Sequence, residues 1–310
     1  MSKWTADDIP DQTGKVAIIT GANSGLGRID ALELTRHGAQ VILAARSIDK
    51  GEAAAGEIIT TVGGLEPIVR RLDLGSLDSI RAFADEFAGQ RIDLLINNAG
   101  VMMTPYGTTS DGFETQFGTN HLGHFALTGL LLEALERAPA ARIVTVSSNE
   151  HKGGSIDFDN LQSDHDYSPR GAYQRSKLAN AIFAIEFDRR LRASGSPAIS
   201  VFAHPGYAAT NLQSAGPTGI MKQIMKVTNR VIAQAPERGV LPTLYAATAP
   251  GVEGGEYFGP DGPGEMRGLP KRVKAKSLAY DPAIGAELWR VSEDLTGVEY
   301  PRHGDPLSVH

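Results

Sequence analysis

The sequence predicts an α/β fold: one doubly wound domain in which a parallel sheet of about seven strands carries helices on both faces. Short apolar runs rich in β-branched residues alternate with longer amphipathic stretches. This alternation is typical of βαβ units, whose right-handed crossovers bring the carboxyl ends of the strands to one edge. A glycine-rich segment at residues 20–27 directly follows the first apolar run, at the edge where such sheets bind ligands.

The first part of the chain supplies four strands and three helices. Apolar runs predict strands at residues 15–20, 40–44, 67–72 and 91–97. Amphipathic stretches predict helices at residues 25–36, 49–60 and 76–87. Gly38 is placed to end the first helix, and Ser76 is placed to open the third.

The rest of the chain continues the same rhythm. We expect strands at residues 142–147, 198–203 and 256–258, the last of them adding one more parallel strand. We expect helices at residues 111–137, 172–194 and 236–247, and irregular structure through the Gly- and Pro-rich residues 251–275. The expected organisation is a tail at 1–12, one domain at 13–300 with a substrate flap at 207–235, and a tail at 301–310.

Composition excludes several classes of function. The chain has 310 residues and a formal net charge of −6, which gives no electrostatic reason to bind nucleic acid or an anionic membrane. It contains no cysteine, which excludes disulfides, a thiol nucleophile and cysteine-ligated zinc. Residues 1–12 hold no apolar stretch and no apolar run is long enough to span a bilayer, so we expect neither a signal peptide nor a membrane anchor. We expect a cytoplasmic protein.

The glycine-rich turn after the first strand is a candidate phosphate site. Glycines let backbone N–H groups approach a pyrophosphate, and the N-terminus of the following helix favours its charge. The spacing G-x-x-x-G-x-G differs from the G-x-G-x-x-G fingerprint, and a tight turn without a ligand is the alternative. The position after the first strand favours phosphate binding by Gly21, Asn23, Ser24, Gly25, Leu26 and Gly27.

The end of the second strand indicates which nicotinamide dinucleotide is preferred. A carboxylate at the position of Ala45 would hydrogen-bond the ribose hydroxyls of NAD, and none is present. Arg46 is placed to bind the 2′-phosphate of NADP, although a solvated surface arginine is the alternative, and Arg28 could assist. The sequence therefore predicts a preference for NADP(H), with NAD(H) possible.

The turns after the third and fourth strands offer further contacts. Asp73 could accept from the adenine amino group, or it could cap the helix near Ser76. After the fourth strand, asparagine side chains could tie neighbouring strands together, while small residues leave room for a ribose; a plain turn is the alternative. The residues concerned are Asn98, Ala99 and Gly100.

Candidate catalytic residues follow the fifth strand. Tyr173 and Lys177 are spaced i, i+4, which places the phenol and the ammonium on one helix face. A nearby cation favours the phenolate and lowers the tyrosine pKa, as acid–base catalysis requires. Ser148 supplies a hydroxyl to hold a substrate oxygen. The alternative for a tyrosine–lysine pair alone is an exposed helix face.

Two histidines, His121 and His124, invite a metal-site interpretation. Their spacing is i, i+3, and no third ligand lies near them in the sequence. We expect packing within the long helix rather than a metal site.

Taken together, the motifs resemble the short-chain dehydrogenase/reductase family in its compact subclass, and its retinol dehydrogenase-like branch in particular. The resemblance extends over residues 13–297. It is carried by the segment 20–27, by NNAG at 97–100, by Asn120 and Ser148, by YQRSK at 173–177 and by HPG at 204–206. The segment 97–128 and the run 142–184 carry the likeness to the branch.

The resemblance implies residue roles. It implies a catalytic tetrad of Asn120, Ser148, Tyr173 and Lys177, with Asn120 in a helix kink where it anchors a water that relays protons. Lys177 would hold the nicotinamide ribose. Further contacts are implied for Asp73 and Leu74 with adenine, for Pro205 and Gly206 with the nicotinamide, and for Thr210 with its carboxamide.

The resulting hypothesis is an NADP(H)-dependent oxidoreductase that interconverts a carbonyl and an alcohol. Met and Ile residues in the flap favour a lipophilic substrate. The alternatives are a non-catalytic nucleotide-binding sensor, which the complete tetrad disfavours, and a sugar-nucleotide epimerase or dehydratase, for which too little chain follows residue 206. The resemblance also implies a homodimer or homotetramer through the helices at 111–137 and 172–194, with Phe183 and Phe187 on an outer face.

Overall fold

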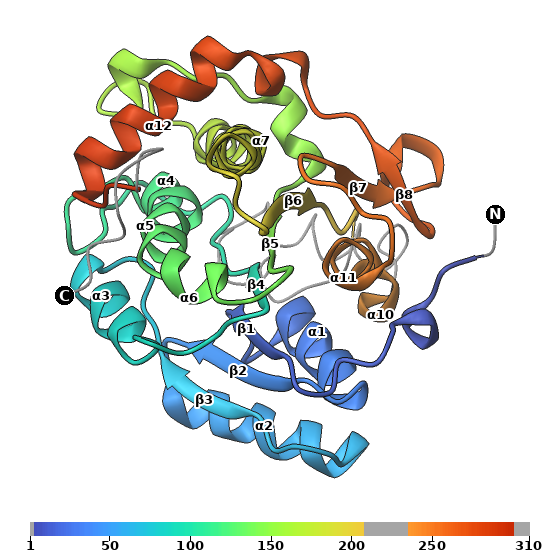
Figure 1. Cartoon of the computed structure of the whole chain (residues 1–310). Helices are drawn as coiled ribbons and strands as arrows, with labels where there is room; N and C mark the ends of the chain where they lie inside the picture. The colour runs from blue at the N-terminus through green and yellow to red at the C-terminus, as the bar shows by residue number, and fades with distance from the viewer. Residues whose placement is uncertain (1–2, 208–234, 301–310) are drawn as a thin grey trace.

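A single sheet organises the computed structural model, which describes residues 3–207 and 235–300. Its eight strands lie in the order β3-β2-β1-β4-β5-β6-β7-β8 (Figure 1). The strands are β1 (Val16–Thr20), β2 (Gln40–Ala45), β3 (Ile68–Arg71), β4 (Leu94–Asn97), β5 (Arg142–Val146), β6 (Ile199–Ala203), β7 (Tyr257–Pro260) and β8 (Pro270–Val273). The first seven pair in parallel, which confirms the doubly wound α/β fold.

The eighth strand corrects the predicted sheet. β7 was expected and pairs in parallel with β6, but β8 returns antiparallel to β7 within a segment predicted to be irregular. The sequence of β8, PKRV, has charged side chains at its centre, and these are exposed at the sheet edge. Charged residues on an edge strand discourage pairing with another chain, and they also remove the apolar alternation by which a strand is predicted.

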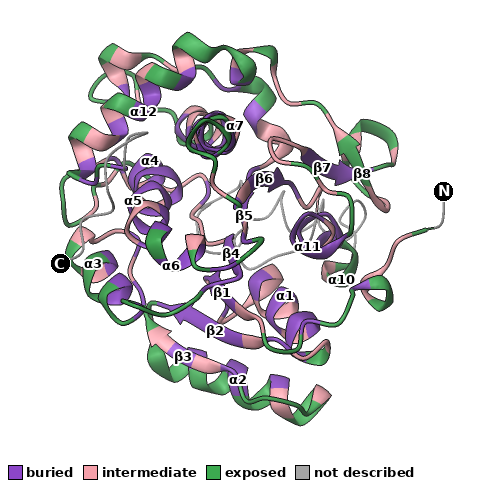
Figure 2. Cartoon of the chain, viewed as in Figure 1, coloured by how far each residue is buried: buried purple, intermediate pink, exposed green. Residues whose placement is uncertain are grey.

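Helices cover both faces of the sheet, and the central strands between them are buried (Figure 2). One face carries α1 (Gly25–Arg36), α2 (Ile48–Val62), α10 (Pro236–Gly239) and α11 (Leu241–Thr248). The other carries α3 (Leu77–Asp85), α5 (Gly123–Leu130), α6 (Leu132–Glu136) and α7 (Pro169–Ser194), with α12 (Pro282–Thr296) packed outside against α7. Two separate clusters of buried apolar residues lie between the sheet and its helices, one on each face, as the alternation of strands and helices requires.

The helix predicted at residues 111–137 is not continuous. It consists of α4 (Thr115–Phe117), a π-helical turn at Gly118–Leu122, α5 and α6. Close packing surrounds the turn: a Cβ at Gly123 would lie 2.4 Å from the backbone oxygen of Leu74. The π-helical turn contains Asn120, where the family resemblance implies a helix kink.

The expected outer face of α7 is covered by the same chain, so the prediction for Phe183 and Phe187 is wrong. Both side chains are buried, and each ring lies 5.8 Å from that of Trp289 on α12. Tyr300 closes the cluster against Phe187 and Trp289. These residues therefore stabilise the monomer and cannot lie in an interface between copies; the oligomeric state stays a prediction.

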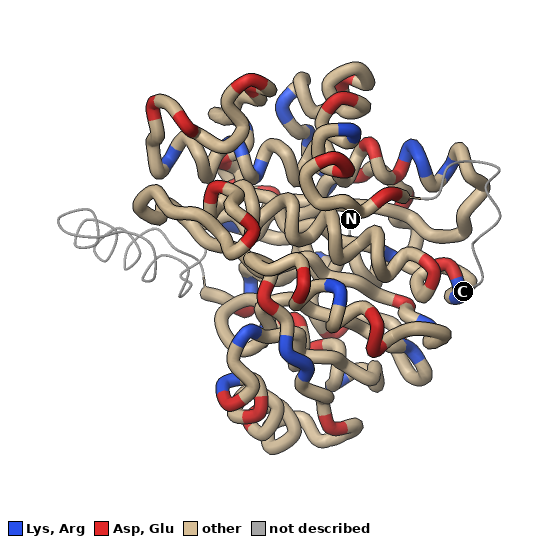
Figure 3. The backbone as a smooth tube through the Cα atoms, turned by 90° about the vertical axis from the view of Figure 1, so that its left-hand side faces the viewer, with Lys and Arg blue, Asp and Glu red and all other residues tan. Residues whose placement is uncertain are grey.

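Charged residues of both signs are interspersed over the surface (Figure 3). Within residues 3–207 and 235–300, no helix is both long enough and apolar enough to cross a membrane.

Candidate active site

A cleft of about 330 Å³ opens at the carboxyl ends of the central strands. Most of the predicted site residues line it, although they come from four separate turns and from α7. They are Gly21, Asn23, Ser24, Gly25, Leu26, Asn98, Ala99, Gly100, Ser148, Tyr173, Lys177, Pro205 and Gly206. The parallel topology therefore brings together residues that follow successive strands in the sequence.

The glycine-rich turn forms one end of the cleft. Gly25 begins α1 with a φ of +59°, and the space beside it is open. Gly27 is buried behind the turn, where a Cβ would lie 2.4 Å from Asn98 Nδ2. A pyrophosphate binds to backbone N–H groups at a helix N-terminus that no side chain covers. The turn provides such groups at the start of a twelve-residue helix, so these residues fit a dinucleotide.

Thr20, the last residue of β1, joins this turn to the segment after β4. Its hydroxyl oxygen accepts hydrogen bonds from the amides of Asn98 and Ala99, both at 2.9 Å. The Asn98 side chain donates in return to the Thr20 carbonyl at 2.8 Å. These bonds hold two cleft walls together, and they show that Asn98 ties neighbouring strands.

His124 connects Thr20 to Asn120, a role that no motif indicated. The His124 Nδ1–H donates to the Asn120 carbonyl at 2.9 Å, so Nε2 carries a lone pair and accepts the Thr20 hydroxyl at 2.9 Å. Burial lowers the pKa of His124 to about 4, which keeps the ring neutral. His121 is also buried and bonds Ser292 at 3.0 Å. Among the described residues, no group of three or more His, Cys, Asp or Glu side chains could hold a metal ion.

Asn120 is buried below the cleft, where its amide group is fully used. Its Oδ1 accepts from the amide of Val101 at 2.7 Å, and its Nδ2 donates to the Val101 carbonyl and to Ser176 Oγ, both at 2.9 Å. In this structure the side chain holds the segment after β4 against α7.

Tyr173 and Ser148 face each other in the cleft. Burial raises the pKa of Tyr173 to about 12, while a hydrogen bond with the Ser148 side chain opposes that rise and the Glu150 carboxylate adds to it. The neighbouring Ser147 hydroxyl donates to the Lys177 carbonyl at 2.8 Å. The Ser147 hydroxyl is therefore used by the backbone of α7, and Ser148 is the serine that influences the phenol.

Lys177 stays a predicted cause of a lowered tyrosine pKa, because burial is the largest influence on that pKa in this structure. Its ammonium donates to the Val146 carbonyl at 3.0 Å and lies 6.0 Å from the centre of the Tyr173 ring. Burial is the dominant influence on both groups, and it lowers the pKa of Lys177 to about 8. The lysine is held at the end of β5, in the cleft wall.

Other predicted contacts lie away from this cleft. Arg46 is exposed, and Arg28 forms an ion pair with Glu57 on α2. The Asp73 carboxylate accepts the amide of Gly75 at 3.0 Å, and Ser76 itself caps the following helix, so the adenine contact of Asp73 stays a prediction. Leu74 is buried in the core, and Thr210 lies outside the described residues, as does nearly all of the expected flap.

The cleft also has walls that sequence reasoning missed. They are Met102, Met103, Val146, Ser147, Glu150 and Tyr207. Met102 and Met103 follow the NNAG segment after one residue, Val101, and Glu150 follows Ser148 by two residues, so proximity to the motifs was the available signal. Their side-chain directions depend on loops that no periodicity describes.

Comparisons with known proteins agree with this geometry. Residues 15–217 match the family model described as short chain dehydrogenase. The chain is 42% identical to human (Homo sapiens) retinol dehydrogenase 14 over 305 residues, covering 92% of this chain and 87% of that protein. It is 43% identical to mouse (Mus musculus) retinol dehydrogenase 11 over 292 residues, with coverages of 92% and 87%.

Solved structures give the same result. The crystal structure of an uncharacterised protein from Mycobacterium paratuberculosis is 44% identical, with a TM-score of 0.81 over 97% of this chain and 100% of that one. A short-chain type dehydrogenase/reductase from Mycobacterium marinum is 25% identical, with a TM-score of 0.63 over 82% and 96%. The chain therefore belongs to the short-chain dehydrogenase family, and it is an NAD(P)-dependent oxidoreductase.

Proposed function

We propose that this protein interconverts an aldehyde or ketone with the corresponding alcohol, with Tyr173 as acid and base and NADP(H) as the preferred cofactor. The observation that carries the proposal is that Ser148, Tyr173 and Lys177 line one cleft, which begins at the glycine-rich turn.

In carbonyl reduction, the hydroxyls of Ser148 and Tyr173 hydrogen-bond the substrate oxygen. A dinucleotide held in this cleft would supply the hydride for the carbonyl carbon. As charge develops on the oxygen, Tyr173 donates its phenolic proton and later regains one from solvent. A phenol with a raised pKa is protonated at neutral pH, which suits the donor role.

The remaining site residues hold the cofactor. Gly21, Gly25 and the N-terminus of α1 would bind the pyrophosphate, while Asn98, Gly100 and Lys177 would line the ribose next to the nicotinamide. Asn120 would act as the fourth member of the tetrad through the α7 contact described above.

The preference for NADP(H) is supported by the end of β2. Ala45 places no carboxylate there to repel a 2′-phosphate, and Arg46 follows it as an exposed cation. A lipophilic substrate is supported by Met102 and Met103 in the cleft wall, and by relatives whose names denote retinol as a substrate.

A panel of carbonyls and alcohols, each tested with NAD, NADH, NADP and NADPH, tests the proposal through the absorbance of the reduced nicotinamide. We expect turnover of lipophilic aldehydes with NADPH, and weaker turnover with NADH. Binding of NADPH without turnover of any substrate would favour the alternative of a non-catalytic sensor.

A further inference from the structure

The hairpin between β7 and β8 contacts two loops of the active site at once. Its tip contains the short 3-10 helix Pro263–Glu265. One contacted loop follows β5 and begins with Ser148; the other follows β6 and contains Pro205 and Gly206. Both loops line the cleft, whereas Glu265 is not among the lining residues.

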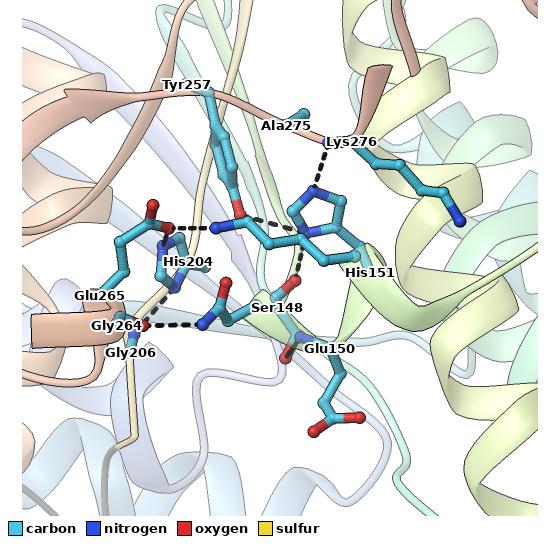
Figure 4. A network of polar contacts seen from close by, with 12 residues as sticks. Ser148, Glu150, His151, His204, Gly206, Tyr257, Gly264, Glu265, Ala275 and Lys276 are labelled. Carbon is cyan, nitrogen blue, oxygen red and sulfur yellow. Dashed lines mark hydrogen bonds and ion pairs between the residues drawn. The ribbon is translucent and has the colours of Figure 1, made fainter. Parts of the chain in front are cut away.

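The Glu265 carboxylate joins the two loops directly (Figure 4). Its Oε2 accepts from Lys152 Nζ at 2.8 Å, four residues after Ser148. The same oxygen is 3.1 Å from His204 Nε2, in the residue before Pro205. One side chain on the hairpin therefore links the serine loop to the turn at Pro205 and Gly206.

The protonation of His204 is fixed by its neighbours. The Gly206 amide donates to His204 Nδ1 at 3.2 Å, so that nitrogen carries a lone pair and the proton is on Nε2, where it is donated to Glu265. The His204 side chain is fully buried, and burial lowers its pKa. Hydrogen bonds from His204 and Lys152 hold the pKa of Glu265 at about 2, so the carboxylate is ionised at neutral pH.

Backbone contacts place the hairpin tip against the same two loops. The Tyr207 amide donates to the Met266 carbonyl at 2.7 Å, and Asn149 Nδ2 donates to the Gly264 carbonyl at 2.9 Å. At Gly206, which has a φ of +67°, a Cβ would lie 2.5 Å from the Met266 oxygen. The turn next to the expected nicotinamide position thus packs directly on the hairpin.

Glu265 adopts this position with a φ of +57°, in the left-handed region that favours glycine. Glycine would adopt this conformation without strain, so the backbone alone does not explain a glutamate here. The two side-chain contacts are what distinguish glutamate from glycine at this position. A non-glycine residue in a strained conformation next to an active site is a common indicator of function.

We propose that Glu265 is a positioning residue, which fixes the serine loop and the Pro205–Gly206 turn relative to each other so that substrate oxygen and nicotinamide are correctly placed. The inference rests on the proposed function. Because small displacements at a reacting centre lower rates by up to about a hundredfold, its loss should reduce both cofactor affinity and turnover.

Three variants test the inference. Glu265→Gly removes both contacts and relieves the backbone strain, so a loss of function cannot be attributed to a strained fold. Glu265→Gln keeps oxygen acceptors for Lys152 and His204 and should rescue most of the function. Glu256→Gln is the matched control, because Glu256 forms an ion pair with Arg272 across the same two strands, away from the cleft.

The first readout is NADPH affinity, measured by nicotinamide fluorescence, with kcat and KM on the best carbonyl. For Glu265→Gly we expect NADPH affinity and kcat to fall by about tenfold to a hundredfold. We expect Glu265→Gln to stay within about threefold of wild type, and Glu256→Gln to match wild type. The second readout is amide exchange in the free protein, which should accelerate in Glu265→Gly at Gly206 and Tyr207 but not in β5.

Unchanged NADPH affinity and unchanged exchange in a folded Glu265→Gly would overturn the inference, as would equal losses in the Glu256→Gln control. Should Glu265→Gly fail to fold, Lys152→Met gives the same test, because it removes one contact from an exposed side chain and leaves the backbone unaltered. A wild-type protein that bound neither NADPH nor NADH would instead overturn the proposed function itself.

Discussion

The ammonium of Lys177 donates to the backbone carbonyl of Val146 at 3.0 Å, which fixes the lysine at the end of β5. The same ammonium lies 6.0 Å from the centre of the Tyr173 ring. Burial then lowers the pKa of the lysine to about 8 and raises that of the tyrosine to about 12. Below pH 8 both groups therefore hold their protons, which is the protonation state that carbonyl reduction needs.

The pH dependence of reduction should follow Lys177. Because its folded-state pKa is lowered to about 8, the ammonium loses its proton as pH rises through that value, and kcat/KM for reduction should fall above it. The Lys177→Arg variant stays charged at all these pH values. Its kcat/KM should therefore begin to fall at a higher pH than that of wild type, even where its turnover is lower. Profiles measured with NADPH between about pH 6 and 10 check this, and a flat wild-type profile through pH 8 would contradict it.

Removing the phenolic hydroxyl should abolish most of the chemistry without altering cofactor binding. Tyr173→Phe keeps the ring and deletes the proton donor, so kcat should fall by about 10²–10⁴-fold while NADPH affinity stays close to wild type. Tyr300→Phe is the control, since the Tyr300 hydroxyl bonds the Phe125 carbonyl at 2.7 Å in an aromatic cluster whose residues do not line the cleft. Wild-type turnover in Tyr173→Phe would show that another group supplies the proton.

Cofactor preference should be invertible at the end of β2. The double variant Ala45→Asp with Arg46→Ile adds a carboxylate that repels a 2′-phosphate and removes the exposed cation. We expect wild type to prefer NADPH by about tenfold to a hundredfold, and the variant to prefer NADH with kcat nearly unchanged. Titration of both cofactors at low salt decides this; tighter NADH binding by wild type would mean that Arg46 makes no phosphate contact.

Asp30, on α1, should make stability depend on pH. Its carboxyl is buried, neither oxygen has a hydrogen-bond partner, and burial raises its pKa well above the usual value. The folded state therefore binds a proton that the unfolded state releases, so stability falls as pH rises from the ordinary aspartate pKa toward the raised folded value. Asp30→Asn cannot ionise, and its stability relative to wild type should increase across that interval.

Chemical unfolding of both proteins from about pH 4 to pH 8 measures this difference, which we expect to reach about 1–3 kcal/mol in favour of the variant. Parallel curves for wild type and Asp30→Asn over the whole range would show that the carboxyl finds a partner or water when it ionises.

Local signals in the sequence were sufficient for most of the fold. α1 runs from Gly25 to Arg36 as predicted, because the glycines, the apolar spacing and Gly38 all lie within one short segment. The cleft residues were also predictable, because the turns that follow parallel strands lie at one edge of the sheet, whatever the directions of their side chains.

Features that depend on distant parts of the chain were not predictable. The apolar pattern at Phe183 and Phe187 does not indicate whether α12 or a second copy of the protein covers these side chains. The hydrogen bond between His124 and Thr20 joins residues 104 positions apart, and the pKa of Tyr173 depends on burial that only the packed structure supplies. The exposed strand β8 is defined by its pairing with β7 rather than by its own composition.

The π-helical turn at Gly118–Leu122 constrains the number of residues that this segment of the chain can contain. Most surface connections tolerate the gain or loss of a residue, whereas a π-helical turn holds one residue more than the α-helical turn that it replaces. Deleting one residue here would let α4 and α5 join as a regular helix, but every side chain beyond the deletion would rotate by about 100° relative to those before it. Asn120 and His124 would then lose their partners Val101 and Thr20, so the register of this short segment is as much a part of the site as its side chains.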